Sequence, residues 1–153
     1  MPQFSTKRRV AHSAAKMFGL VADVDLYPQF VPLCESLRVK SRTKKGEGVV
    51  VLVADMTVAY KLVRQTFTSR VTLDRPNLKI LVEYVNGPFR HMQNRWVFHP
   101  TGENSCEVDF FIDYEFRSRT LGILMGTLFD TVFRRMAAAF EQRADAIYGR
   151  SRA

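Results

Sequence analysis

The last stretch of the chain has the pattern of one long helix. From about Ser118 to Tyr148 apolar residues recur at steps of three, four and seven, the spacing of a single helical face. The arc they cover is roughly 200° wide, about twice the stripe of an ordinary surface helix. A flat neighbour would leave part of that arc in water, so the pattern predicts a surface that curves around the helix. The residues of this arc are Leu121, Leu124, Met125, Leu128, Phe129, Val132, Phe133, Met136, Phe140 and Ile147.

The middle of the chain has the pattern of a sheet. From residue 36 to residue 116 polar and apolar residues alternate, as in strands with one buried and one wet face. Turn sequences interrupt the alternation at residues 45–48, 74–77, 86–88 and 100–104. Short turns between successive strands predict an antiparallel meander. With a weaker strand at the start, the expected strands are 3–11, 36–44, 49–60, 62–73, 79–86, 89–99 and 106–116.

Two short segments after the first strand are predicted to be helical or turn-like. Ser13 is a suitable N-cap for residues 14–24, and Pro28 and Pro32 restrict residues 27–33 to a compact turn or a single helical turn. We therefore expect an α+β fold, with a curved antiparallel sheet of about seven strands wrapped around a long C-terminal helix. Residues 1–148 are expected to form one domain, and residues 149–153 a frayed basic tail.

The chain is strongly basic, and the charge is unevenly distributed. The formal net charge is +8, of which residues 1–45 carry +6, residues 46–116 carry −2 and residues 117–153 carry +4. This excess favours an anionic partner, either a phospholipid surface or RNA, and not DNA. Arg38, Lys40, Arg42 and Lys44 are expected to project from one side of one strand, where they either protect a sheet edge or dock on that partner. No aromatic residue alternates with them for base stacking, which favours lipid over RNA.

The sequence contains no recognisable catalytic or metal-binding motif. His12, His91 and His99 form no HxH or HExxH pattern, and Cys34 and Cys106 share no CxxC or metal spacing. We expect reduced thiols, no metal, no cofactor and no enzymatic activity. We also expect a cytoplasmic protein, at most peripheral at the inner membrane, because no signal segment or spanning stretch is found.

Four stretches carry a resemblance to a known family: Tyr27–Cys34 (YPQFVPLC), Ala54–Val58, Thr66–Val71 and Gly87–Phe98. In these stretches and in the order of its elements, the chain resembles the START-like superfamily, also called helix-grip or Bet v 1-like, over about residues 3–148. Within it the chain is similar to the polyketide cyclase/dehydrase branch, which includes coenzyme Q-binding proteins and a bacterial ribosome-association toxin. The resemblance implies an apolar cavity between sheet and long helix, with ubiquinone or a similar lipid as bound ligand.

The candidate ligand contacts are inward-facing side chains of the strands, the long helix and the proline segment. Ser69 and Asn94 either orient a polar group of the ligand or are satisfied by the backbone. Residues 27–33 either cap the core or form a lid, and as a lid Phe30 or Val31 would approach Leu121 to Met125. The candidates are Phe30, Val31, Met56, Phe67, Ser69, Met92, Asn94, Trp96, Phe110, Leu121, Leu124, Met125 and Leu128.

Gly122 and Gly126 lie in the first turns of the predicted long helix. Each costs about 1 kcal/mol relative to Ala in a helix interior. They either permit close packing against the sheet or leave room for a ligand.

The leading hypothesis is a non-catalytic carrier of an isoprenoid quinone, serving respiratory or quinone-biosynthetic enzymes at the membrane. One alternative is a ribosome-interacting protein that blocks subunit association. Another is a cyclase or dehydratase, which would need a placed general acid or base. The sequence offers no obvious candidate for that group.

Overall fold

A seven-stranded antiparallel sheet and one long helix make up most of the chain. The computed structural model describes residues 3–60 and 63–149. The strand order is β1-β7-β6-β5-β4-β3-β2, so β1 and β2 form the two edges. The predicted α+β architecture, with two short helical segments after the first strand, is confirmed. The elements are β1 (Gln3–Val10), α1 (Ala14–Ala22), the 3-10 helix η1 (Val24–Gln29), β2 (Cys34–Gly46), β3 (Val49–Tyr60), β4 (Val63–Asp74), β5 (Lys79–Asn86), β6 (Phe89–Gly102), β7 (Ser105–Phe116) and α2 (Arg119–Tyr148).

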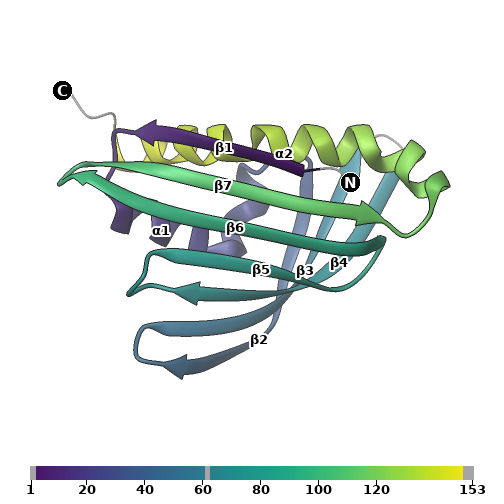
Figure 1. Ribbon diagram of the computed structural model, residues 1–153, viewed down its shortest axis with the longest axis horizontal. Coiled ribbons are helices and arrows are strands. Elements are labelled where there is room, and N and C mark those ends of the chain that lie inside the picture. Colours follow the sequence, from purple (N-terminus) through teal and green to yellow (C-terminus); the bar gives the residue numbers. More distant parts are fainter. Residues whose placement is uncertain (1–2, 61–62, 150–153) are drawn as a thin grey trace.

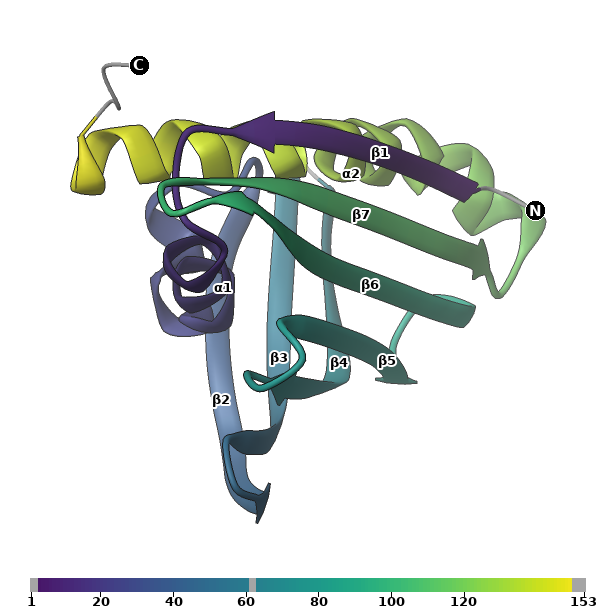
Figure 2. The same cartoon turned by 60° about the vertical axis from the view of Figure 1, so that its left-hand side comes forward.

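The sheet curves so strongly that its two ends run in different directions. In Figures 1 and 2, β1 and β7 run alongside α2, whereas β2 and β3 run across that direction. Register shifts interrupt the pairing of β2 with β3 and of β6 with β7, and such bulges bend a strand and increase its twist. The curvature provides the concave surface that the wide apolar arc of α2 requires.

The buried face of α2 begins at Met125, later than the sequence pattern predicts. Ser118 caps the helix, its hydroxyl accepting a hydrogen bond from the Leu121 N–H at 3.0 Å. The first turns of α2 reach past the end of β7 (Figures 1 and 2), so Leu124 is 62% exposed and its predicted inward position is wrong. Ile147, in the last turn, is also exposed. The buried residues of α2 are Met125, Leu128, Phe129, Val132, Phe133, Met136, Ala137, Phe140 and Ala144.

Phe89 is the centre of an aromatic cluster beneath the first half of α2. Its side chain is 1% exposed, and five other rings have their centroids between 5.1 and 6.0 Å from its own. Four of these contacts are edge-to-face and the one with Phe116 is stacked, and both arrangements stabilise a core beyond the area they bury. Aromatic side chains, mostly phenylalanines, therefore fill this part of the interior. The five rings belong to Phe67, Tyr84, Tyr114, Phe116 and Phe129.

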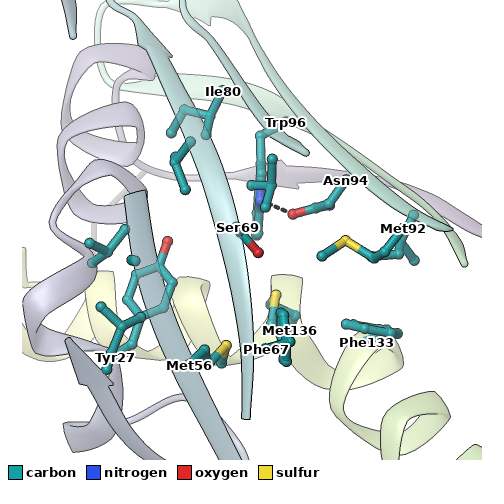
Figure 3. Close-up of a pocket in the computed structure, with 16 residues that line it drawn as sticks. Tyr27, Met56, Phe67, Ser69, Ile80, Met92, Asn94, Trp96, Phe133 and Met136 are labelled. Atoms are coloured by element: carbon teal, nitrogen blue, oxygen red, sulfur yellow. Dashed lines mark hydrogen bonds between the residues drawn. The ribbon is translucent and has the colours of Figure 1, made fainter. Parts of the chain in front are cut away.

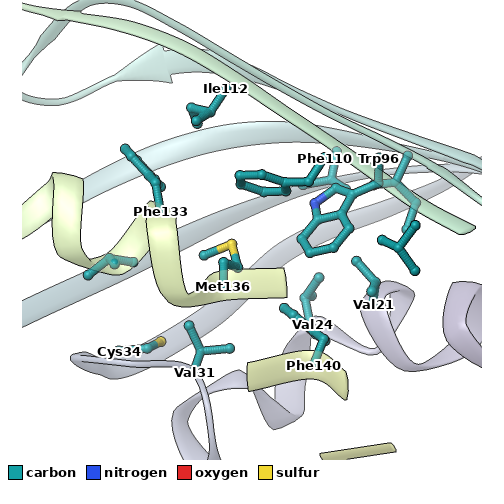
Figure 4. Packing of buried hydrophobic residues seen from close by; sticks show 14 of the residues in the cluster. Val21, Val24, Val31, Cys34, Trp96, Phe110, Ile112, Phe133, Met136 and Phe140 are labelled. Atoms are coloured by element: carbon teal, nitrogen blue, oxygen red, sulfur yellow. The ribbon is translucent and has the colours of Figure 1, made fainter. Parts of the chain in front are cut away.

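The proline segment packs against the second half of α2. The rings of Tyr27 and Phe30 lie 5.1 and 5.0 Å from that of Phe140, which also contacts Trp96 (Figure 4). The Tyr27 hydroxyl donates to the Val21 carbonyl. Phe140 follows Leu121 by about 28 Å along the helix axis, so Phe30 does not approach Leu121 to Met125 as expected. The end of the same segment, Pro32 and Leu33, does share a groove with Leu124. Phe30 caps the core at the opposite end of α2.

Candidate ligand-binding cavity

A small apolar cavity lies between the concave face of the sheet and the middle of α2 (Figure 3). Its volume is about 70 Å³, enough for a few water molecules at roughly 10–15 Å³ each. Three of the residues that line it are methionines, whose unbranched side chains change conformation readily. The lining residues are Val24, Tyr27, Leu37, Ala54, Met56, Phe67, Ser69, Val71, Ile80, Val82, Met92, Asn94, Trp96, Ile112, Phe133 and Met136.

The alternation of the strands brings these side chains together. Ala54 pairs with Ser69 and Met56 with Phe67 across β3 and β4, and paired residues of an antiparallel ladder share a face. On α2, Phe133 is followed one turn later by Met136, and both point into the cavity (Figure 3). The candidate contacts from the sequence did not include these two residues. Their helical spacing identified the buried face, but not the position along α2 where the packing leaves a gap.

Six of the predicted ligand contacts line this cavity, and the other seven lie outside it. Phe110 is fully buried behind Trp96, with the ring centroids 4.7 Å apart. Leu124 and Leu128 border a separate open groove near the start of α2. The six that line the cavity are Met56, Phe67, Ser69, Met92, Asn94 and Trp96, and the remaining outside residues are Phe30, Val31, Leu121 and Met125.

The two inward polar residues differ in their hydrogen bonding. Asn94 donates to the Phe111 carbonyl at 2.8 Å and accepts from the Trp96 indole N–H at 3.0 Å. It is therefore satisfied by the protein and holds the indole ring in place. Ser69 is 6% exposed, and within residues 3–60 and 63–149 its hydroxyl has no hydrogen-bond partner. Ser69 is thus the polar group that the cavity offers to a ligand.

Among the described residues that line the cavity, none is suited to proton transfer at neutral pH. Tyr27 is the titratable residue among its described lining residues. Burial raises the pKa of Tyr27 far above its usual value, and its hydroxyl already donates to the Val21 carbonyl. A general base needs a pKa near the operating pH. The lining therefore favours binding over acid–base chemistry.

Both cysteines are expected to be unreactive in the native protein. Burial raises the pKa of the Cys34 and Cys106 thiols to about 11. At pH 8 only about one thiol in a thousand would then be ionised, and the thiolate is the reactive form. Labelling with iodoacetamide at pH 8, followed by mass spectrometry, should modify neither residue until urea is added. Rapid labelling of the folded protein would contradict this expectation.

Neither proposed role explains Gly126. A Cβ atom built on Gly126 would have no heavy atom within 4 Å outside its own helix, and one on Gly122 would meet Phe116 at 3.9 Å, an ordinary contact. Neither glycine lines the cavity. The prediction that Gly126 permits close packing against the sheet is therefore wrong. The prediction that the two glycines leave room for a ligand is wrong for this cavity.

The basic residues of β2 lie on two faces of the edge strand, not on one. Arg38 pairs with Asp55 and Lys40 approaches the Asp55 carboxylate at 4.0 Å, on the outer face. A register shift follows Val39, and beyond it Arg42 pairs with the inward Leu52 and contacts Asp25 of η1 at 2.6 Å. Lys44, two residues later, shares the side of Arg42. A bulge inverts the alternation, so the prediction of a single stripe is wrong.

Each of the three histidines lies near a different aspartate. His91 and His99 lie on the outer face, as predicted, with Asp113 and Asp109 at 3.4 and 3.8 Å. His12 is buried and lies 2.7 Å from the Asp145 carboxylate. In residues 3–60 and 63–149, no three His, Cys, Asp or Glu side chains are grouped to hold a metal ion. Over the same residues no helix combines the length and apolar character needed to span a bilayer.

Comparison with protein families gives a match over most of the chain. A family described as "Polyketide cyclase / dehydrase and lipid transport" matches residues 10–141. The chain is 34% identical over 148 residues to the Ribosome association toxin RatA of Escherichia coli K12, covering 97% of this chain and 90% of that protein. It is 32% identical over 152 residues to the Coenzyme Q-binding protein COQ10 homolog B, mitochondrial, of Xenopus laevis, covering 97% of this chain and 60% of that protein.

Solved structures share the fold. A START superfamily protein from Mycobacterium smegmatis superposes with a TM-score of 0.78 at 21% identity, covering 95% of this chain and 98% of that one. At this identity the likeness concerns the fold alone. It agrees with the seven-stranded curved sheet and the long C-terminal helix described above.

Proposed function

The chain belongs to the polyketide cyclase/dehydrase and lipid transport family, and on that premise we propose that it binds the head group of an isoprenoid quinone between the sheet and α2. The observation that carries the proposal is the apolar cavity with one unpaired hydroxyl, that of the buried Ser69. A quinone ring is flat and apolar, with carbonyl oxygens at its edge. Ser69 would donate to one of these oxygens.

The cavity must widen to take such a ligand. Pockets for ligands of this size are about 300–1,000 Å³, whereas this cavity is about 70 Å³. Met56, Met92 and Met136 lie on different walls (Figure 3), and each can change rotamer without moving the backbone. We infer that the methionine side chains fill the site in the empty protein and move aside when the ring enters. The similarity to a protein named for coenzyme Q binding supports the same ligand class.

Trp96 provides a direct test, because it is the single tryptophan of the chain and lines the cavity. A short-tailed ubiquinone should quench its fluorescence saturably, at one equivalent per chain. Ser69→Val should weaken binding by about five- to tenfold, the usual effect of losing one hydrogen bond. Thr72→Val, on the outer face of the same strand, is the matched control and should bind normally. Absence of saturable quenching in the folded wild-type protein would refute the proposal.

A second candidate function is association with the ribosome. It is favoured by the 34% identity to a protein named as a ribosome association toxin, over nearly the whole chain. Sedimentation of the protein through a sucrose gradient with ribosomal subunits separates the two candidates. Co-migration with one subunit, together with no quenching by quinone, would favour the ribosome.

A further inference from the structure

A groove open to solvent lies at the start of α2, at the far end of the gap that holds the cavity. Its volume is about 640 Å³. It runs between the first half of α2, the facing ends of β3 and β4, and the residues that precede β2. The lining residues are Pro32, Leu33, Tyr60, Val63, Leu124, Thr127, Leu128, Thr131 and Arg135.

The groove and the cavity follow one another along the same face of β3. Met56 lines the cavity and Tyr60 lines the groove, about 13 Å further along the strand. Val58 lies between them on that face and is 1% exposed. Leu128, 7% exposed, faces the groove from α2. A layer of aliphatic side chains thus separates the groove from the cavity.

Three large apolar side chains are exposed around the groove. Ile123 is 75% exposed and Leu124 is 62% exposed, on adjacent positions of α2, and Tyr60 opposite them is 49% exposed. Ile123 also borders the neighbouring depression at the start of α2. Exposed apolar side chains clustered in one place mark an interaction surface more often than scattered ones do.

The charges around this surface are mostly positive. Arg135 lines the groove, and Arg117 and Arg119 line the depression beside Ile123. Arg64 follows Val63 and is paired with Glu35, and Arg90 is paired with Glu115. The surface therefore carries more arginines than carboxylates, and these surround an aliphatic centre.

We propose that this face docks on an anionic phospholipid bilayer, with Ile123 and Leu124 inserted among the acyl chains and the arginines at the headgroups. An apolar strip flanked by cations is the usual composition of interfacial helices. A second copy of the chain, packed by two-fold symmetry, would bring the same arginines together. Their repulsion disfavours a dimer through this face. Among the described residues that line this surface, nucleic acid would find two aromatic rings, Tyr60 and the half-buried Phe116, beside aliphatic side chains that do not stack on bases. The proposal rests on the proposed function in that docking would open the groove, and the cavity behind it, to a membrane lipid.

Cosedimentation with vesicles tests the docking face. Wild-type protein should pellet with phosphatidylcholine vesicles that contain phosphatidylglycerol, and much less with phosphatidylcholine alone. The double variant Ile123→Gln/Leu124→Gln keeps good helix formers at exposed positions, so it should fold normally. Its vesicle affinity should fall about a hundredfold or more, as expected for two aliphatic side chains withdrawn from the acyl layer. Ile147→Gln, at an exposed position in the last turn of α2, is the matched control and should bind like wild type.

Charge variants locate the electrostatic part of the surface. Arg117→Gln/Arg119→Gln should remove most of the preference for phosphatidylglycerol, whereas Arg38→Gln/Lys40→Gln on β2 should keep it. The proposal is overturned if the Ile123/Leu124 variant binds vesicles normally or if the β2 pair carries the preference. Loss of a dimer or of ribosome binding in the Ile123/Leu124 variant, without any effect on vesicles, would also overturn it.

Quinone titration separates this proposal from the proposed function. The Ile123/Leu124 variant should show normal quenching of Trp96 by a water-soluble, short-tailed quinone while it fails to pellet with vesicles. If wild-type protein pellets but never binds quinone, the docking face stands and the ligand assignment fails. If it binds quinone but does not pellet with vesicles, the ligand assignment stands and the docking face fails.

Discussion

Replacing Phe89 with alanine is expected to lower the free energy of unfolding by about 3–5 kcal/mol, the usual cost of deleting a buried aromatic ring. The ring is 1% exposed and meets five other rings, which cannot all collapse into the vacated space. Urea denaturation followed by far-UV circular dichroism gives the free energy of unfolding.

The matched control is Phe111→Ala, the same chemical change on the outer face of β7. There the ring is half-buried and contacts the Arg95 guanidinium at 4.6 Å. We expect a loss of about 1–2 kcal/mol, from the cation–π contact and the strand preference of phenylalanine. Equal losses for the two variants would mean that the cluster around Phe89 is not the centre of the core.

Asn94→Ala is expected to cost about 2–4 kcal/mol, although alanine fits the strand without strain. The change removes the acceptor for the Trp96 indole N–H and the donor to the Phe111 carbonyl. Each buried polar group left without a partner costs about 1–3 kcal/mol. The same urea experiment measures the loss, and a shift in the tryptophan emission spectrum should accompany it because the indole N–H changes its surroundings.

Gln93→Ala is the natural comparison, since the adjacent side chain is exposed on the outer face of β6. Its effect should stay within about 0.5 kcal/mol. If Asn94→Ala proves equally mild, the hydrogen bonds of Asn94 contribute little to stability. The residue would then be free to turn toward a ligand, and the assignment of Ser69 as the polar contact would lose its basis.

The sequence predicted the elements well because alternation and helical spacing depend on local side-chain burial. The strands of the meander and α2 are close to the expected ranges for this reason. Three features depend on distant parts of the chain and were missed. The bulge after Val39 reverses the face of Arg42, the first turns of α2 extend past the sheet and expose Leu124, and Phe30 packs on Phe140.

The position of the cavity was harder to predict than its chemistry. Inward residues of β3, β4 and β6 were identified correctly, since the pleat fixes which side chains share a face. Along α2 the buried face runs from Met125 to Ala144, and no local signal distinguishes the filled part from the gap. The sequence therefore suggested Leu121 to Leu128, whereas the structure places Phe133 and Met136 at the cavity.

The order of strands also affects how the chain can fold during synthesis. β1 pairs only with β7 in the sheet, Val10 opposite Cys106. At roughly 5–20 residues per second, about a hundred residues separate the two strands by about 5–20 s of translation. During that interval β1 is an unpaired strand, and such strands invite aggregation unless charges oppose it. Lys7, Arg8 and Arg9 place three positive charges on this segment, which oppose its pairing with other chains, and in the finished protein Arg8 pairs with Glu141.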